Sequence, residues 1–149
     1  MILEKYNIIQ EFSIKKIYPS TLNIQIKPTK FIARVSNNSQ YLVGANGKLI
    51  EDKSNNELLP YIFGEFSSHD FLTFKKNIEK SKFSFSNLKE LSFFPSGRWD
   101  ILTDKGILIK LPQEHIVASL NLSKRLINND NFKDYKFIDL RIKNHLVAK

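Results

Sequence analysis

The chain of 149 residues contains no cysteine, which excludes disulfide bonds and thiolate metal sites. It has only five glycines, spread singly, so no glycine-rich phosphate-binding loop is present. No apolar run approaches the roughly 18–20 residues of a membrane-spanning helix. The first residues include a glutamate and lack a small-residue cleavage site, so they do not resemble a signal peptide. The 42% hydrophobic content is that of one globular domain, or of one domain and part of another.

Arginine is scarce although the chain is basic. The formal net charge is +8, and lysine outnumbers arginine nineteen to four. A basic balance favours nucleic acid or an anionic membrane surface as a partner. However, the lysines are scattered singly or in pairs, and bidentate phosphate and base recognition favours arginine. The charge also fits a biased composition rich in asparagine and isoleucine, so we do not expect nucleic-acid binding.

The usual catalytic constellations are missing. The three histidines, His69, His115 and His145, have no partner at a metal-ligand spacing such as HxxxH. No nucleophile elbow is present, and nothing in the sequence brings two acidic residues together. The sequence therefore predicts a protein without enzymatic activity, cofactor or bound metal.

Two pairs of opposite charges are predicted on strand surfaces. Arg98 and Asp100 are two residues apart, so both fall on the outer face of one strand. An exposed ion pair there contributes about 0–1 kcal/mol. Asp139 and Arg141 repeat the spacing near the C-terminus.

The stretch from Leu88 to Leu111 predicts three consecutive antiparallel strands. Apolar and polar residues alternate along it, as in a sheet with one buried face. The sequences PSG and DKG are typical of the tight turns between the strands. We expect Trp99 to pack against Phe93 and Ile107, a burial that contributes about 2–3 kcal/mol.

Two helices are predicted around this meander. The first spans residues 67–80, begins with a capping box of Ser67 and Asp70, and carries an apolar stripe. The second begins with Pro112 at its first helical position and ends at about Asn128.

Further strands are predicted before the meander. Residues 12–17 and 22–27 alternate in polarity around a YPST turn, which predicts a hairpin with one buried face. Residues 31–35 form another candidate strand. Residues 41–43 and 48–50 flank an Asn-Gly hairpin signal. We interpret residues 51–57 as a polar, mobile loop and residues 58–64 as an apolar connector.

The C-terminal segment predicts an exposed sheet edge. Residues 135–140 form a strand, and residues 145–148 form a short last strand after a turn at Lys143-Asn144. The outer N–H and C=O groups of an edge strand are free to pair with a strand of another protein. The alternative, left open by the sequence, is that Lys143 and Lys149 only protect this edge from self-association. The predicted fold class is α+β, with a mostly antiparallel sheet of meander and hairpins flanked by two or three helices.

Several motifs together resemble the FtsQ/DivIB family of bacterial cell-division proteins. They are an S-x-R-W-D sequence, a hairpin ending in G-I-x-I-x-L-P, and a later I-D-L-R. The matching residues are Ser96, Arg98, Trp99, Asp100, Gly106, Ile107, Ile109, Leu111 and Pro112, then Ile138, Asp139, Leu140 and Arg141. The N-terminal hairpin resembles the closing part of a POTRA module. We therefore expect residues 1–34 to be the C-terminal part of an incomplete POTRA-like module, and residues 35–149 to be the β-domain of the family.

The resemblance implies a non-catalytic divisome scaffold that acts in septum formation. Such a protein binds FtsB-type and FtsL-type partners by β-strand addition at its C-terminal edge. The implied partner-binding residues are Arg141, Ile142, Lys143, Asn144, His145, Leu146, Val147 and Ala148. The implied location is the periplasmic face of the bacterial inner membrane at the septum, with membrane association only through an N-terminal helix absent from this chain.

Two alternative functions remain open at this stage. One is a POTRA-type outer-membrane assembly or secretion module. The other is a basic nucleic-acid-binding β-domain, which the net charge of +8 would suit.

Overall fold

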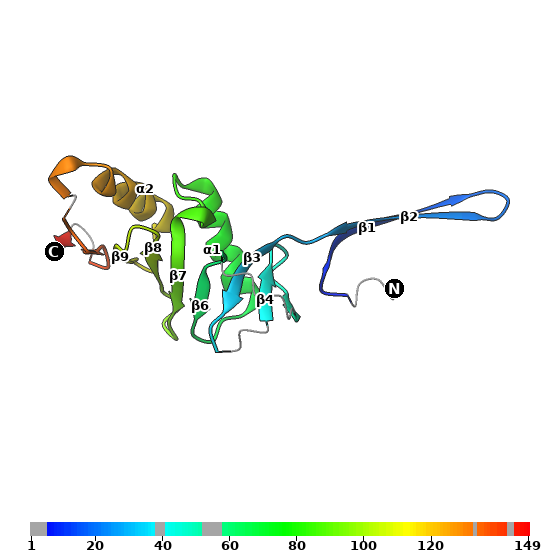
Figure 1. Cartoon of the computed structure of the whole chain (residues 1–149), viewed down its shortest axis with the longest axis horizontal. Helices are drawn as coiled ribbons and strands as arrows, with labels where there is room; N and C mark the ends of the chain where they lie inside the picture. Colours follow the sequence, from blue (N-terminus) through cyan, green and yellow to red (C-terminus); the bar gives the residue numbers. More distant parts are fainter. Residues whose placement is uncertain (1–5, 38–40, 52–57, 133, 143–144) are drawn as a thin grey trace.

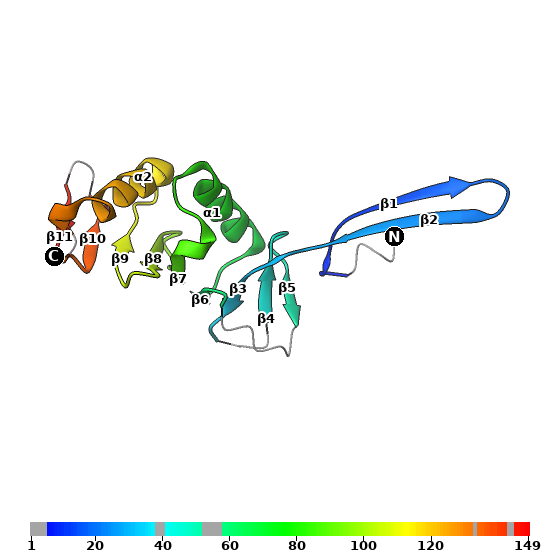
Figure 2. The same ribbon diagram turned by 45° about the horizontal axis from the view of Figure 1, so that its top comes forward.

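The computed structural model describes residues 6–37, 41–51, 58–132, 134–142 and 145–149. Within these ranges the chain forms a nine-stranded sheet and a separate two-stranded sheet. Two helices lie on one side of the large sheet, and the two-stranded sheet projects away from it as a ribbon (Figures 1 and 2). The C-terminus lies at the end of the molecule opposite the ribbon (Figure 1).

The strands before the first helix are β1 (Ile9–Ile17), β2 (Thr21–Pro28), β3 (Phe31–Val35), β4 (Tyr41–Gly44), β5 (Leu49–Glu51) and β6 (Tyr61–Phe63). The helices are α1 (Ser68–Lys80) and α2 (Ile116–Ile127). The remaining strands are β7 (Leu88–Phe93), β8 (Trp99–Thr103), β9 (Leu108–Lys110), β10 (Phe137–Asp139) and β11 (Val147–Ala148).

The large sheet has the order β11-β10-β9-β8-β7-β6-β3-β4-β5. Its pairs are antiparallel except β3 with β6, β6 with β7, and β9 with β10. The α+β prediction, a mostly antiparallel sheet flanked by helices, is confirmed. The predicted meander is also confirmed, because β7, β8 and β9 pair antiparallel in sequence order.

The core lies between the sheet and the helices. A row of fully buried side chains crosses the sheet on the helix side, with Leu91, Ile101, Ile109 and Ile138 on four adjacent strands. Trp99, which is 3% exposed, lies on the same side. Its ring centroid is 4.7 Å from that of Phe74 on α1 and 4.8 Å from that of Phe93, the partner expected from the sequence.

Helix α1 begins where the sequence predicts. The Asp70 backbone N–H donates to Ser67 Oγ at 3.1 Å, and the Ser67 backbone N–H donates to Asp70 Oδ2 at 2.9 Å. This capping box satisfies two donors that the first turn leaves free. The predicted stripe of Phe71, Phe74 and Ile78 is buried.

Helix α2 begins later than predicted. Its N-cap is His115, with φ 57° and ψ 34°, and Ile116 is its first residue. A right-handed helix cannot continue through a residue with positive φ. Pro112 therefore belongs to the connector after β9, and the prediction that it opens the helix was wrong.

The connector predicted for residues 58–64 is partly a strand. Within it, β6 lies between β3 and β7 and pairs parallel with both. Ile62 is fully buried there. The predicted loop at residues 51–57 is described only at Glu51, the last residue of β5; residues 52–57 lie outside the described residues.

The N-terminal hairpin forms, but its predicted buried face is wrong. Strands β1 and β2 pair with Phe12 opposite Ile26 and Ile14 opposite Ile24, so these four side chains share one face. Ile14, Ile24 and Ile26 are nevertheless exposed. Alternating polarity predicts that a ribbon has an apolar face, but not that another element covers it.

The two sheets separate at Thr29 and Lys30, before β3 begins at Phe31. The predicted boundary between residues 34 and 35 thus falls inside β3, near the end of that strand. Neither helix among the described residues has the length and apolar character needed to cross a membrane.

Candidate functional site

The C-terminal strand β11 forms one edge of the large sheet. Within the described part of the chain it pairs only with β10, with Asp139 opposite Val147 and Ile138 opposite Ala148. Just beyond it, the Lys149 backbone N–H donates to the Phe137 oxygen at 3.1 Å, and the Phe137 N–H donates to the Lys149 oxygen at 3.1 Å. Lys149 and Phe137 are therefore a hydrogen-bonded pair of the antiparallel ladder.

This pair fixes the direction of every peptide group in β11. Hydrogen-bonded and non-hydrogen-bonded pairs alternate along an antiparallel ladder. The next pair, Ile138 with Ala148, is thus non-hydrogen-bonded, and the N–H and C=O of Ala148 face away from β10. Val147 forms the following hydrogen-bonded pair, and its N–H and C=O face Asp139. The outer edge of β11 therefore presents the peptide groups of Ala148.

Apolar side chains surround this edge. Ile142 is 65% exposed, and Leu146 and Val147 are each 44% exposed. Arg141 and His145 are also exposed, whereas Ala148 is half-buried. Lys143 and Asn144, the remaining members of the predicted set, lie outside the described residues.

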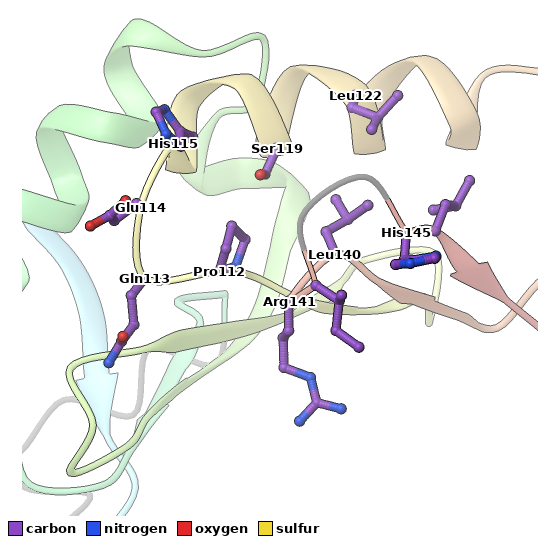
Figure 3. A pocket seen from close by; sticks show the side chains of 11 residues that line it. Pro112, Gln113, Glu114, His115, Ser119, Leu122, Leu140, Arg141 and His145 are labelled. Atoms are coloured by element: carbon purple, nitrogen blue, oxygen red, sulfur yellow. The ribbon is translucent and has the colours of Figure 1, made fainter.

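A groove of about 610 Å³ lies beside the edge. Its walls come from the connector before α2, from α2 itself and from the segment between β10 and β11 (Figure 3). Its lining includes Pro112, His115, Ser119, Leu122, Leu140 and Leu146. Leu122 projects from α2 toward the C-terminal segment, while the Arg141 guanidinium points away from the helix (Figure 3). The groove is thus lined by both apolar and polar side chains.

Most of the groove has no signal in the local sequence patterns. Of the predicted partner-binding residues, Arg141, Ile142, His145 and Leu146 line it. The wall formed by residues 112–122 was missed. That wall reaches the C-terminal segment because β9 and β10 pair in parallel across an intervening helix, a non-local pairing without a local sequence pattern.

A row of alternating charges crosses the sheet on the side away from the helices. In the strand register, Lys110 on β9 lies opposite Asp100 on β8 and opposite Asp139 on β10. Arg98 Nε donates to Asp100 Oδ1 at 3.1 Å, and Arg141 Nη2 donates to Asp139 Oδ2 at 2.6 Å. Each carboxylate therefore has a cation on its own strand or just beyond it.

The two carboxylates differ in environment. Asp100 is only 4% exposed, so the prediction of an exposed ion pair at this position was wrong. Burial raises the pKa of Asp100, against the opposing effect of Arg98. The hydrogen bonds from Arg141 lower the pKa of Asp139. Asp139 is next to the edge strand, so its pair with Arg141 helps to hold the chain as it leaves β10.

The three histidines lie in different parts of the fold. His115 and His145 both line the groove, on opposite walls, and His69 lies on α1. Among the described residues, no group of three or more histidine, aspartate or glutamate side chains is arranged to hold a metal ion. The absence of catalytic activity stays a prediction from sequence.

Comparison with known proteins gives one consistent similarity. The sequence profile described as "Cell division protein FtsQ/DivIB, C-terminal" matches residues 33–141. Two proteins described as "Cell division protein FtsQ", from Rhizobium radiobacter and Agrobacterium fabrum, are each 23% identical over 90% of this chain. The chain spans 66% and 44% of their respective lengths.

A solved structure is also similar. It is the major extracytoplasmic domain of the trans isomer of the cell-division protein DivIB from Geobacillus stearothermophilus. The match has a TM-score of 0.47 at 14% identity and covers 63% of this chain and 87% of that one.

Proposed function

The chain belongs to the FtsQ/DivIB family of bacterial cell-division proteins, and from this premise we propose that it is a non-catalytic scaffold of the division machinery. In this proposal its C-terminal edge, β11, binds FtsB-type and FtsL-type partners by β-strand addition. The observation that supports the proposal most strongly is the outward-facing peptide of Ala148 at the end of the sheet.

Strand addition requires a backbone edge and a side-chain environment that suits the incoming strand. The edge offers one donor and one acceptor at Ala148, and the peptide groups of Val147 and Lys149 remain engaged with β10. Main-chain hydrogen bonds to an edge provide affinity, and alternate side chains provide specificity. The exposed apolar side chains of Ile142, Leu146 and Val147 supply apolar surface for the partner.

The groove beside β11 gives side chains of the partner a place to bind. Side chains of an added strand point alternately to the two sides of the sheet. Ala148 lies in the same cross-strand row as Ile138, on the helix side. Partner residues that point to this side face the groove under α2, where Leu122 and Leu140 are apolar. We expect apolar partner residues there.

The other expectations from the resemblance are retained as part of the proposal. Residues 1–34 are the end of a POTRA-like module, and residues 35–149 are the β-domain. The protein acts at the periplasmic face of the inner membrane, at the division septum. Membership of a cell-division family supports this function over outer-membrane assembly or nucleic-acid binding.

The experiment uses two substitutions at one position. Ala148→Pro removes the outward N–H, whereas Ala148→Ser changes the side chain and keeps the N–H. Binding of a peptide from the FtsB-type partner of the same organism is measured by isothermal titration calorimetry. Loss of one hydrogen bond, about 1–1.5 kcal/mol, corresponds to roughly tenfold weaker binding for the proline variant.

The serine variant should bind like the unaltered chain. Equal affinities for all three proteins would contradict strand addition at this edge. Ala148 makes no ladder bond to β10, so both variants should retain the sheet. Circular dichroism and thermal unfolding of each variant check this.

A further inference from the structure

The base of the ribbon is joined to the β4–β5 turn by a cluster of polar contacts. We call the side chains of Asn7, Thr29 and Asn46 the junction clasp. Asn7 precedes β1, Thr29 follows β2, and Asn46 lies in the turn between β4 and β5. The clasp therefore connects both ends of the ribbon with a hairpin of the large sheet.

Asn46 is the centre of the clasp. Its Nδ2 donates to the Asn7 backbone oxygen at 2.8 Å, and its backbone N–H donates to Thr29 Oγ1 at 3.3 Å. Its Oδ1 accepts from the Lys48 backbone N–H at 3.1 Å, which holds the turn. The sequence signal at Asn46 was a tight hairpin turn, and the structure adds a second role for the same side chain.

Asn7 makes a second connection in the opposite direction. Its Nδ2 donates to the Leu49 backbone oxygen at 2.9 Å. Strand β5 is the other edge of the large sheet. The Gly44 N–H donates to the Lys48 oxygen, so by alternation the peptide groups of Leu49 face outward from this edge. Asn7 thus occupies an outward acceptor of β5, in contrast to the open peptide at Ala148.

The backbone around the clasp is tightly packed. The Ala45 N–H donates to the Lys30 oxygen at 2.8 Å. Thr29 is only 7% exposed. A Cβ atom at Gly44 would lie 2.6 Å from Asn46 Oδ1 and 2.8 Å from Thr29 Cγ2, so a larger residue there would displace the clasp side chains. The contact leaves little space for the ribbon to pivot about Thr29 and Lys30.

We propose that the junction clasp fixes the direction of the β1–β2 ribbon relative to the large sheet. The ribbon makes no use of its apolar face for this purpose, since Ile14, Ile24 and Ile26 are exposed. Polar contacts hold the ribbon at its base. The clasp makes the ribbon a rigid arm, held at a set orientation to the β11 edge at the far end of the sheet.

The test measures the distance between the tip of the ribbon and helix α1, which lies on the large sheet. Because the chain lacks cysteine, Ser20→Cys at the ribbon tip and Lys76→Cys on α1 introduce the only two sites for spin labels. Double electron–electron resonance should give one narrow distance distribution for this labelled protein. Asn46→Asp loses the donor to Asn7 but keeps the Oδ1 acceptor for Lys48, so it should at least double the width of the distribution.

Asn23→Asp is the matched control, because Asn23 lies on β2 away from the clasp. Thr29→Val, which removes the Oγ1 acceptor without changing the shape of the side chain, provides a second variant in case Asn46→Asp does not fold. It should also broaden the distribution. A broad distribution in the labelled parent, or equal widths in the parent and the folded clasp variants, would overturn the proposal.

Discussion

Lys149 and Phe137 exchange two backbone hydrogen bonds, each at 3.1 Å, beside the pairing of the last two strands of the sheet. This reciprocal pair determines that Ala148 faces outward and that Val147 faces β10. The two adjacent residues therefore have different roles in the same edge, one available to a partner and one needed for the fold.

Val147→Pro should loosen the C-terminal strand, whereas Ala148→Pro should not. Proline at 147 removes an N–H that pairs with β10, at a cost of about 1 kcal/mol or more to the local structure. Hydrogen exchange of the Phe137 and Asp139 amides measures the effect. We expect faster exchange in Val147→Pro and unchanged exchange in Ala148→Pro. The reverse order would show that the ladder has the other register.

Phe74→Ala should strongly destabilise the domain. Phe74 is 1% exposed, and its ring stacks on Trp99. Truncation of a buried phenylalanine costs about 3–5 kcal/mol. Phe63→Ala is the control, since Phe63 is 38% exposed and should cost about 1 kcal/mol or less. Urea unfolding followed by tryptophan fluorescence measures both free energies; similar values would contradict the assigned core.

Asp100→Asn should change how stability depends on pH. The pKa of Asp100 is raised in the folded protein, mainly by burial. The folded state therefore keeps this proton to higher pH than the unfolded chain does. The free energy of unfolding should fall as the pH rises from about 4, the ordinary value for aspartate, through the raised pKa. This contribution should be absent in Asp100→Asn.

Asp139→Asn should have the opposite effect on the pH profile. Hydrogen bonds from Arg141 lower the pKa of Asp139, so the folded state favours its charged form. The resulting stability is present above about pH 4 and is lost as the pH falls through the lowered pKa. The free energy of unfolding, measured by denaturation between about pH 2 and 4, should therefore depend less on pH for Asp139→Asn than for the unaltered chain. A steeper loss in the variant would contradict the assigned pair.

Local sequence patterns predicted much of this fold because its central part is local. The meander from β7 to β9 needs only alternating polarity and two short turns. The capping box of Ser67 and Asp70 marks the N-terminus of helix α1. Strand β6 was not predicted, because its three residues are too few to show a pattern. Its partners β3 and β7 are also distant in sequence, so no local pattern indicates the pairing.

The burial of a side chain was harder to predict than the face of the strand on which it lies. The alternation of Trp99 and Asp100 correctly placed them on opposite sides of β8. It did not show that Asp100 is buried, because that depends on Lys110 and on the arginine beside it. The ribbon shows the converse, since its apolar alternation is regular and its isoleucines are exposed. In both cases burial depends on residues that are not part of the alternating stretch itself.

The site was predicted in part for the same reason. The last strand was expected at an edge of the sheet, and β11 is observed at the edge. The groove beside it depends on residues 112–122, which only the parallel pairing of β9 and β10 brings close. That binding occurs at this edge remains a proposal.

Amide exchange at single-residue resolution tests the strand-addition proposal most directly. Exchange rates of the β11 amides are measured by nuclear magnetic resonance with and without the FtsB-type peptide. The proposal predicts that the Ala148 amide exchanges rapidly alone and becomes protected in the complex, while the Val147 and Lys149 amides are protected in both. Binding of the peptide without new protection at Ala148 would contradict it.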